Sequence, residues 1–164
     1  YFPTRVRAAR DGEDGSNPMP GCDGVIELAP QGPLTAMGWE QSPKSHQLII
    51  ERSARESGLP IYITENGSAW EDTVSDDGAV HDPERVNYLH EHLGAVADAI
   101  EGGTDVRGYF AWSLLDNCEW AYGYDKRFGI IHVDYDTQKR TIKDSGLEYA
   151  QIIANEHART RGDR

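Results

Sequence analysis

The sequence predicts an α/β fold in which a parallel sheet is covered by helices. In the middle of the chain, segments with helical signals alternate with segments rich in β-branched and aromatic residues, in the order helix, strand, helix, strand. Such alternation favours a parallel sheet, because a helix crosses over between neighbouring parallel strands. The length of 164 residues fits one domain of ordinary size.

The first predicted helix begins at Pro43 and ends at Gly58. Ser42 precedes Pro43, and this pair is typical of a helix start, because the serine side chain caps free N–H groups and proline fits the first turn. Gly58 is a typical C-terminal stop. Pro60 then forces an extended backbone, so a strand is expected directly afterwards.

The second predicted helix begins at Pro83, with Asp82 in the capping position, and ends before Gly102. Its apolar residues recur at three- and four-residue steps, which predicts one buried face. The residues of this face are Val86, Leu89, Leu93, Val96 and Ile100. A last helix is predicted over residues 144–158, and its inward residues are Leu147, Ala150, Ile153 and Ala154.

The strands are predicted between these helices. Residues 61–63 indicate a short buried strand, and Asn66 with Gly67 indicates a turn after it. Residues 106–115 are the second strand of the sheet. Residues 128–134 and 141–143 are expected to form a β-hairpin.

The remaining segments are predicted to be irregular. Residues 1–10 are typical of a chain leaving a strand, and residues 70–78 of an acidic, turn-rich loop. Residues 11–33 are rich in Gly, Pro, Asp and Asn, which predicts a long surface loop with a small strand near residues 22–26. An active-site loop and a plain flexible excursion are both compatible with that composition.

The composition excludes several classes of partner. A formal net charge of -12 argues against nucleic acid and against an anionic membrane surface, both of which require a basic footprint. No apolar run is long enough for a transmembrane helix. Cys22 and Cys118 lie far apart without metal-ligand spacing, so both are expected to be reduced thiols in a cytoplasmic protein. His90 and His92 are two apart on a helix and do not share a face, which disfavours a metal site.

Glu65 is the first candidate for chemistry. It is a carboxylate at the carboxyl end of a predicted strand, and that end of the strands is the catalytic face of a (β/α) barrel. Taken alone, a glutamate in this position is more often a solvated residue. A closed barrel needs eight strand–helix units and about 250 residues, so the bottom-up interpretation is a piece of an α/β barrel. The opening at Tyr1 without an initiator Met fits a chain cut from a longer one.

Several segments resemble glycoside hydrolase family 1, the retaining β-glucosidases. Residues 61–67 (IYITENG) resemble the nucleophile motif, and residues 111–120 (AWSLLDNCEW) resemble the sugar-binding strand and loop. Three further segments match in the family's order, namely residues 37–40, 124–135 and 143–145. The resemblance implies a (β/α)8 TIM barrel. Residues 1–164 are then the C-terminal part of a single catalytic domain and supply about its last two to three β/α units.

The resemblance also implies catalytic roles. Glu65 is the expected nucleophile and must be ionised to attack. Tyr1 matches a tyrosine that donates a hydrogen bond to the nucleophile, although the neighbours that would establish this match are absent. The family's acid/base residue lies in an Asn-Glu-Pro motif, which does not occur in this sequence. We therefore expect the chain to be incomplete and inactive alone, with the acid/base glutamate supplied by the remainder of the barrel.

Four residues are implied in substrate binding. Glu119 and Trp120 correspond to the residues that hold the glycone hydroxyls farthest from the anomeric carbon, and Trp112 lies at the base of the sugar pocket. Phe128 either walls the pocket or packs in the core. A Glu-Trp pair in this loop disfavours the 6-phospho-glycosidase branch. Cys118 stands where the family usually has Phe, which puts the aim of the loop in question.

The predicted function is hydrolysis of terminal non-reducing β-D-glucosyl residues with retention, through a covalent glycosyl-enzyme. The expected partners are a β-glucoside or oligosaccharide substrate and the rest of the barrel, and no cofactor is implied because carboxylates and water suffice. Two alternatives are a non-catalytic sugar-binding protein on a degraded barrel and one half of a split glucosidase. The residues do not separate glucose from galactose or fucose acceptance.

Overall fold

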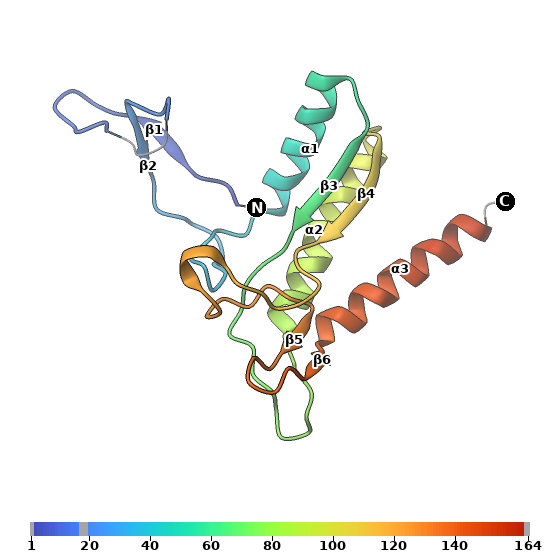
Figure 1. Cartoon of the computed structure of the whole chain (residues 1–164). Coiled ribbons are helices and arrows are strands. Elements are labelled where there is room, and N and C mark those ends of the chain that lie inside the picture. The colour runs from blue at the N-terminus through green and yellow to red at the C-terminus, as the bar shows by residue number, and fades with distance from the viewer. Residues whose placement is uncertain (1, 17–19, 163–164) are drawn as a thin grey trace.

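The computed structural model describes residues 2–16 and 20–162. Its centre is a parallel pair of strands, β3 (Ile61–Asn66) and β4 (Val106–Ala111). Two helices, α1 (Pro43–Ser57) and α2 (Pro83–Glu101), pack together on one face of this pair (Figure 1). The predicted alternation of helices and parallel strands is confirmed, and the described residues do not form a closed barrel.

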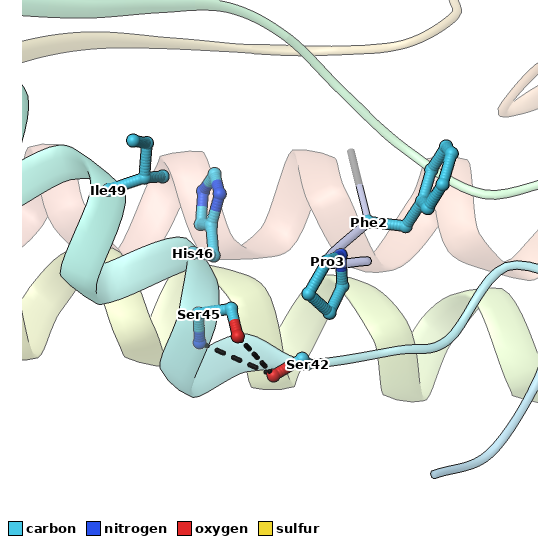
Figure 2. A pocket seen from close by; sticks show the side chains of 6 residues that line it. All are labelled: Phe2, Pro3, Ser42, Ser45, His46 and Ile49. Carbon is cyan, nitrogen blue, oxygen red and sulfur yellow. Dashed lines mark hydrogen bonds between the residues drawn. The ribbon is translucent and has the colours of Figure 1, made fainter. Parts of the chain in front are cut away.

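The ends of α1 follow from local signals, as predicted. The Ser42 side chain accepts a hydrogen bond from the Ser45 N–H at 3.4 Å (Figure 2), which satisfies one of the free donors of the first turn. At the other end Gly58 adopts φ 67° and donates its N–H to the Ala54 carbonyl at 2.9 Å. That left-handed conformation favours glycine.

The ends of α2 are also confirmed, but the predicted cap and buried face are partly wrong. Asp82 makes no cap, because its carboxylate accepts hydrogen bonds from Ser145 and Arg85 instead. Ile100 is 48 % exposed. The buried face is formed by Arg85, Tyr88, Leu89, His92, Ala95, Val96 and Ala99. A search for apolar residues alone does not find Arg85 and His92. Such polar residues can be buried when their polar atoms have hydrogen-bond partners.

β3 differs from the expected buried strand followed by a turn. Asn66 is its last residue rather than part of a turn, and it is 1 % exposed. Only one side of β3 is covered: Ile63 packs with Ile50 of α1 and Val96 of α2, whereas Tyr62 is 57 % exposed. The described chain covers the sheet on one face, so only residues that point to that face are buried.

β4 is shorter than predicted and ends at Ala111. The chain then leaves the parallel pair and runs beside the segment that precedes β5. Ser113 donates its N–H to the Phe128 carbonyl at 3.1 Å, and the Ile130 N–H donates to the Ser113 carbonyl at 2.8 Å. The Trp112 N–H still bonds Asn66 of β3, and from Ser113 onward the stretch finds its backbone partners in the hairpin region.

Two small antiparallel pairs and a 3₁₀ turn complete the strands and turns. β1 (Val6–Ala8) pairs with β2 (Val25–Glu27), close to the small strand expected in the long loop. β5 (Ile131–Val133) and β6 (Arg140–Ile142) form the predicted hairpin, with β5 shorter than predicted and β6 beginning one residue earlier. The turn η1 spans Trp120–Tyr122.

The predicted inward face of α3 (Asp144–Gly162) is wrong. Leu147 is 59 % exposed and Ile153 is 40 % exposed, and Ala150 and Ala154 are exposed as well. The start of α3 is held in the structure, since Ser145 is fully buried, while its later turns extend away from the strands (Figure 1). Across the described residues, no helix is long and apolar enough to cross a membrane.

Candidate active site

Glu65 and Trp112 lie at the same end of the two parallel strands. The Asn66 carbonyl, next in the chain to Glu65, accepts a hydrogen bond from the Trp112 N–H at 2.8 Å. A Cβ atom on Gly67 would lie 1.7 Å from the Trp112 carbonyl oxygen, so only glycine fits there. The Glu65 side chain is exposed and Trp112 is half-buried. The two predicted site residues are therefore neighbours at the carboxyl end of the sheet, as parallel strands require.

The loop over residues 117–126 presents Glu119 and Trp120. It turns back on itself where the Glu119 N–H donates to the Gly123 carbonyl at 2.6 Å. Trp120 adopts φ 42°, which is uncommon for a residue with a side chain, and its side chain leaves the rest of the molecule so that the residue is 91 % exposed. Glu119 is half-buried, and Cys118 beside it is an exposed free thiol.

Both ends of this loop are held by one ion pair. Arg127 Nη1 lies 2.6 Å from Asp116 Oδ2, and the Asp116 side chain is fully buried. The Arg127 guanidinium also lies 4.8 Å from the centre of the Tyr135 ring, a distance suited to a cation–π contact. Asp116 accepts a further bond from the Gly129 N–H at 3.0 Å. The loop therefore starts and ends at a common buried anchor.

The anchor continues into a buried ionic cluster. Lys143 Nζ lies 2.8 Å from Asp116 and 2.5 Å from Asp72, and Arg85 lies 2.6 Å from Asp72. Burial alone would raise the pKa of Asp116, but Lys143 and Arg127 outweigh it and hold that pKa below its ordinary value. The full cluster consists of Asp72, Asp82, Asp116, Arg85, Arg127 and Lys143. Its opposite charges balance, so the ends of α2, α3 and the loop are tied together without a net buried charge.

Phe128 is placed in the core in this structure, being 2 % exposed. Its ring lies 5.9 Å from that of Trp39, which in turn stacks on Phe2 at 4.6 Å. The sequence left two roles open for Phe128, pocket wall and core packing, and its described contacts are those of core packing. Tyr1, the other predicted catalytic residue, lies outside the described residues.

Sequence reasoning missed the residues that support the site. Asp116 and Lys143 were given no role at the site and Asn66 was predicted only to form a turn, although all three lie inside segments that resemble the family. Their signal is faint, because each acts through partners far away in the chain. Asp116 and Lys143, for example, are 27 residues apart.

One hollow on the surface is unrelated to these residues. It has a volume of about 380 Å³ and is lined by Phe2, Pro3, Ser42, Ser45, His46 and Ile49 (Figure 2). None of the side chains that line it is a carboxylate. It therefore lacks the pair of carboxyl groups that retaining glycoside hydrolysis requires.

Comparison with known proteins identifies the family. Residues 1–158 match glycosyl hydrolase family 1. The chain belongs to that family. It is 53 % identical over 124 residues to β-glucosidase A of Thermotoga maritima, covering 75 % of this chain and 28 % of the relative. It is 49 % identical over 145 residues to a bifunctional β-D-glucosidase/β-D-fucosidase of Bifidobacterium breve, covering 85 % of this chain and 32 % of the relative.

A solved structure agrees with the family assignment. The β-glucosidase of Thermotoga maritima in complex with glucoimidazole superimposes with a TM-score of 0.79 at 50 % identity, over 80 % of this chain and 30 % of that one. Family membership makes the parallel pair and its helices part of a TIM barrel. The chain spans about 28–32 % of the length of these curated relatives.

Proposed function

We propose that residues 1–164 form the C-terminal part of a single TIM-barrel domain, about its last two to three β/α units, in a retaining β-glucosidase. The proposed reaction is hydrolysis of terminal non-reducing β-D-glucosyl residues. The observation that carries the proposal is the position of Glu65: it is the last residue but one of β3, next to the Asn66 that bonds Trp112, at the strand end where TIM barrels place catalytic groups. Membership of glycosyl hydrolase family 1 supports the same reaction class.

The proposed chemistry uses two carboxyl groups about 5 Å apart on either side of the anomeric carbon. A Glu65 carboxylate oxygen forms a bond to the anomeric carbon while the bond to the leaving oxygen breaks, and the partner acid protonates that oxygen. Water then attacks the anomeric carbon, the partner takes its proton, and Glu65 leaves as a carboxylate. The partner glutamate belongs to the remainder of the barrel, and Tyr1 is the proposed hydrogen-bond donor to Glu65.

The proposed sugar contacts lie on the loop and at the end of β4. A carboxylate can accept hydrogen bonds from two hydroxyl groups, and an indole offers an apolar face with one N–H donor. Glu119 and Trp120 therefore suit the glycone hydroxyls, with Trp112 under the ring. A relative crystallised with glucoimidazole supports a sugar ligand of this kind.

An aryl β-glucoside assay tests the proposal. The purified chain alone should show no turnover, because the acid/base group is outside it; turnover that is abolished by Glu65→Gln would contradict this expectation. Combined with the remainder of the barrel, the chain should become active. Glu65→Gln should then lower the rate roughly 10⁵-fold, as loss of a covalent nucleophile does.

A 2-fluoro glucoside then identifies the nucleophile. The label should be recovered on Glu65, and recovery on another residue would refute the assignment. Glu71→Gln is the matched control, because the Glu71 side chain is an 80 % exposed carboxylate six residues further along. Sugar binding without any turnover or labelling would favour the non-catalytic alternative on a degraded barrel.

A further inference from the structure

The strand that carries Glu65 contains an extra residue. Ile63 lies opposite Tyr109 and Asn66 lies opposite Ala111, so β3 advances three residues while β4 advances two. A β-bulge of this kind redirects side chains and is common beside active sites. Ile63 and Asn66 are consequently buried, whereas Thr64 and Glu65 are both exposed, against the strict alternation of a regular strand.

Asn66 closes this bulge through its side-chain amide. The Asn66 Nδ2 donates to the Tyr88 hydroxyl at 3.2 Å, and the Asn66 Oδ1 accepts from the Tyr109 hydroxyl at 2.9 Å. Tyr88 belongs to α2 and Tyr109 to β4, so one amide joins three elements. Burial raises the pKa of Tyr88 to about 12 and also raises that of Tyr109, so both hydroxyls keep their protons and Tyr109 can donate.

The backbone of the same residue is held as well. The Asn66 carbonyl accepts from Trp112, and the absence of a Cβ on Gly67 lets the Trp112 carbonyl approach. The His92 ring stacks on Tyr88 at 3.7 Å and fixes that tyrosine from the helix side. Asn66 is thus fixed by its amide and by its carbonyl, in a residue that is 1 % exposed.

We infer that Asn66 is a positioning residue that holds the bulge of β3 and so aims Glu65 at the anomeric carbon. The inference rests on the proposed function. Glu65 is the preceding residue, so a rotation or slip of Asn66 is passed directly to it through one peptide unit. A displacement of about 1 Å in a reacting group can lower the rate by about 10²-fold. Asn66 does this without touching the sugar, because its buried side chain is bonded to Tyr88 of α2 and Tyr109 of β4.

The experiment measures covalent labelling in the enzyme formed by this chain and the remainder of its barrel. The probe is a 2-deoxy-2-fluoro-β-glucoside, and affinity is measured separately with a non-reactive 1-thio-β-glucoside. Asn66→Ala removes both amide bonds, and Tyr109→Phe removes one hydroxyl while keeping the ring. Tyr149→Phe is the matched control, because that hydroxyl bonds the Tyr109 carbonyl at 3.3 Å and does not reach Asn66.

We expect Asn66→Ala to slow labelling about 10²-fold and Tyr109→Phe about 10-fold, with thio-glucoside affinity changed less than threefold. Tyr149→Phe should label within twofold of the parent. The thermal unfolding temperature of each variant shows whether slower labelling comes from unfolding or from a misplaced Glu65. Labelling of Tyr109→Phe at the rate of Tyr149→Phe, in folded proteins, would overturn the inference alone. A parent enzyme that is not labelled on Glu65 would overturn the proposed function together with it.

Discussion

The two faces of the β3–β4 pair differ in how their residues are held. On the face towards α1 and α2, Ile63 is 8 % exposed and Asn66 is 1 % exposed. On the opposite face, Tyr62 is 57 % exposed and Phe110 is 58 % exposed, and Glu65 is exposed with them. The covered face is therefore a small core built within this chain, while the candidate catalytic residue lies on the open face. Residues that maintain the fold and residues proposed for chemistry are separated by the thickness of one strand.

The largest expected effect comes from removing a charge from the buried ionic cluster that anchors the loop over residues 117–126. Lys143→Met leaves Asp72 and Asp116 buried without their shared ammonium, because Lys143 is fully buried. Removing one partner of a buried ion pair costs about 3–5 kcal/mol. The free energy of unfolding from urea titration measures this loss.

Arg52→Met is the control for the charge cluster. Arg52 pairs with Glu56 at 2.8 Å, but their side chains are 63 % and 58 % exposed. Surface pairs of this kind contribute about 0.3–0.5 kcal/mol. Equal losses for Lys143→Met and Arg52→Met would show that the interior cluster does not support the fold.

A smaller loss of the free energy of unfolding is expected when two neighbouring residues of β3, one on each face, are replaced by alanine. Ile63→Ala removes a side chain from the core cluster and should cost about 3 kcal/mol. Tyr62→Ala, one residue earlier, should cost under about 1 kcal/mol because the ring lies mainly in solvent. Urea titration of both variants tests the comparison directly, and a larger loss for Tyr62→Ala would reverse it.

The smallest expected effect is a loss of the free energy of unfolding at low pH, caused by a histidine buried behind the covered face. Burial lowers the pKa of His92 from 6.5 to about 4. The folded chain then binds fewer protons than the unfolded chain between these values, so stability is complete above about pH 6.5 and falls as the pH falls towards 4. The expected loss by pH 5 is about 2 kcal/mol.

His92→Gln should remove most of this pH dependence of the free energy of unfolding between pH 7 and pH 5. Some dependence should persist, because burial also lowers the pKa of His46. His90→Gln is the control for a histidine substitution on the same helix, because it replaces an exposed ring that lies 3.0 Å from Glu148. A parent chain that is equally stable at pH 5 and pH 7 would contradict the prediction.

Local signals in the sequence predicted the helix ends well. Ser42 and Gly58 act within a few residues of the helix that they terminate, so α1 could be placed without knowledge of the rest of the fold. The inward side of α3 could not be placed in this way. Leu147 and Ile153 have apolar spacing, but exposure depends on what packs against them, which spacing does not contain.

The candidate site, like the helices, was predictable from the sequence only in part. The adjacency of Glu65 and Trp112 follows from parallel strands, since their carboxyl ends meet at one edge. The role of Asn66 does not follow, because an Asn-Gly pair usually marks a turn. Here its partners Tyr88 and Tyr109 are 22 and 43 residues away, a separation over which single-sequence patterns carry no information.

The ion pair between Asp116 and Arg127 has a consequence for how binding preference can change. The side chains at the two ends of the segment between them meet at a contact of 2.6 Å. A segment anchored in this way behaves as an exchangeable module. We expect that residues 117–126 can be replaced or lengthened while the parallel pair and its helices keep their contacts. The proposed sugar contacts of Glu119 and Trp120 lie in that module, so variants designed to test sugar preference should keep Asp116 and Arg127 in place.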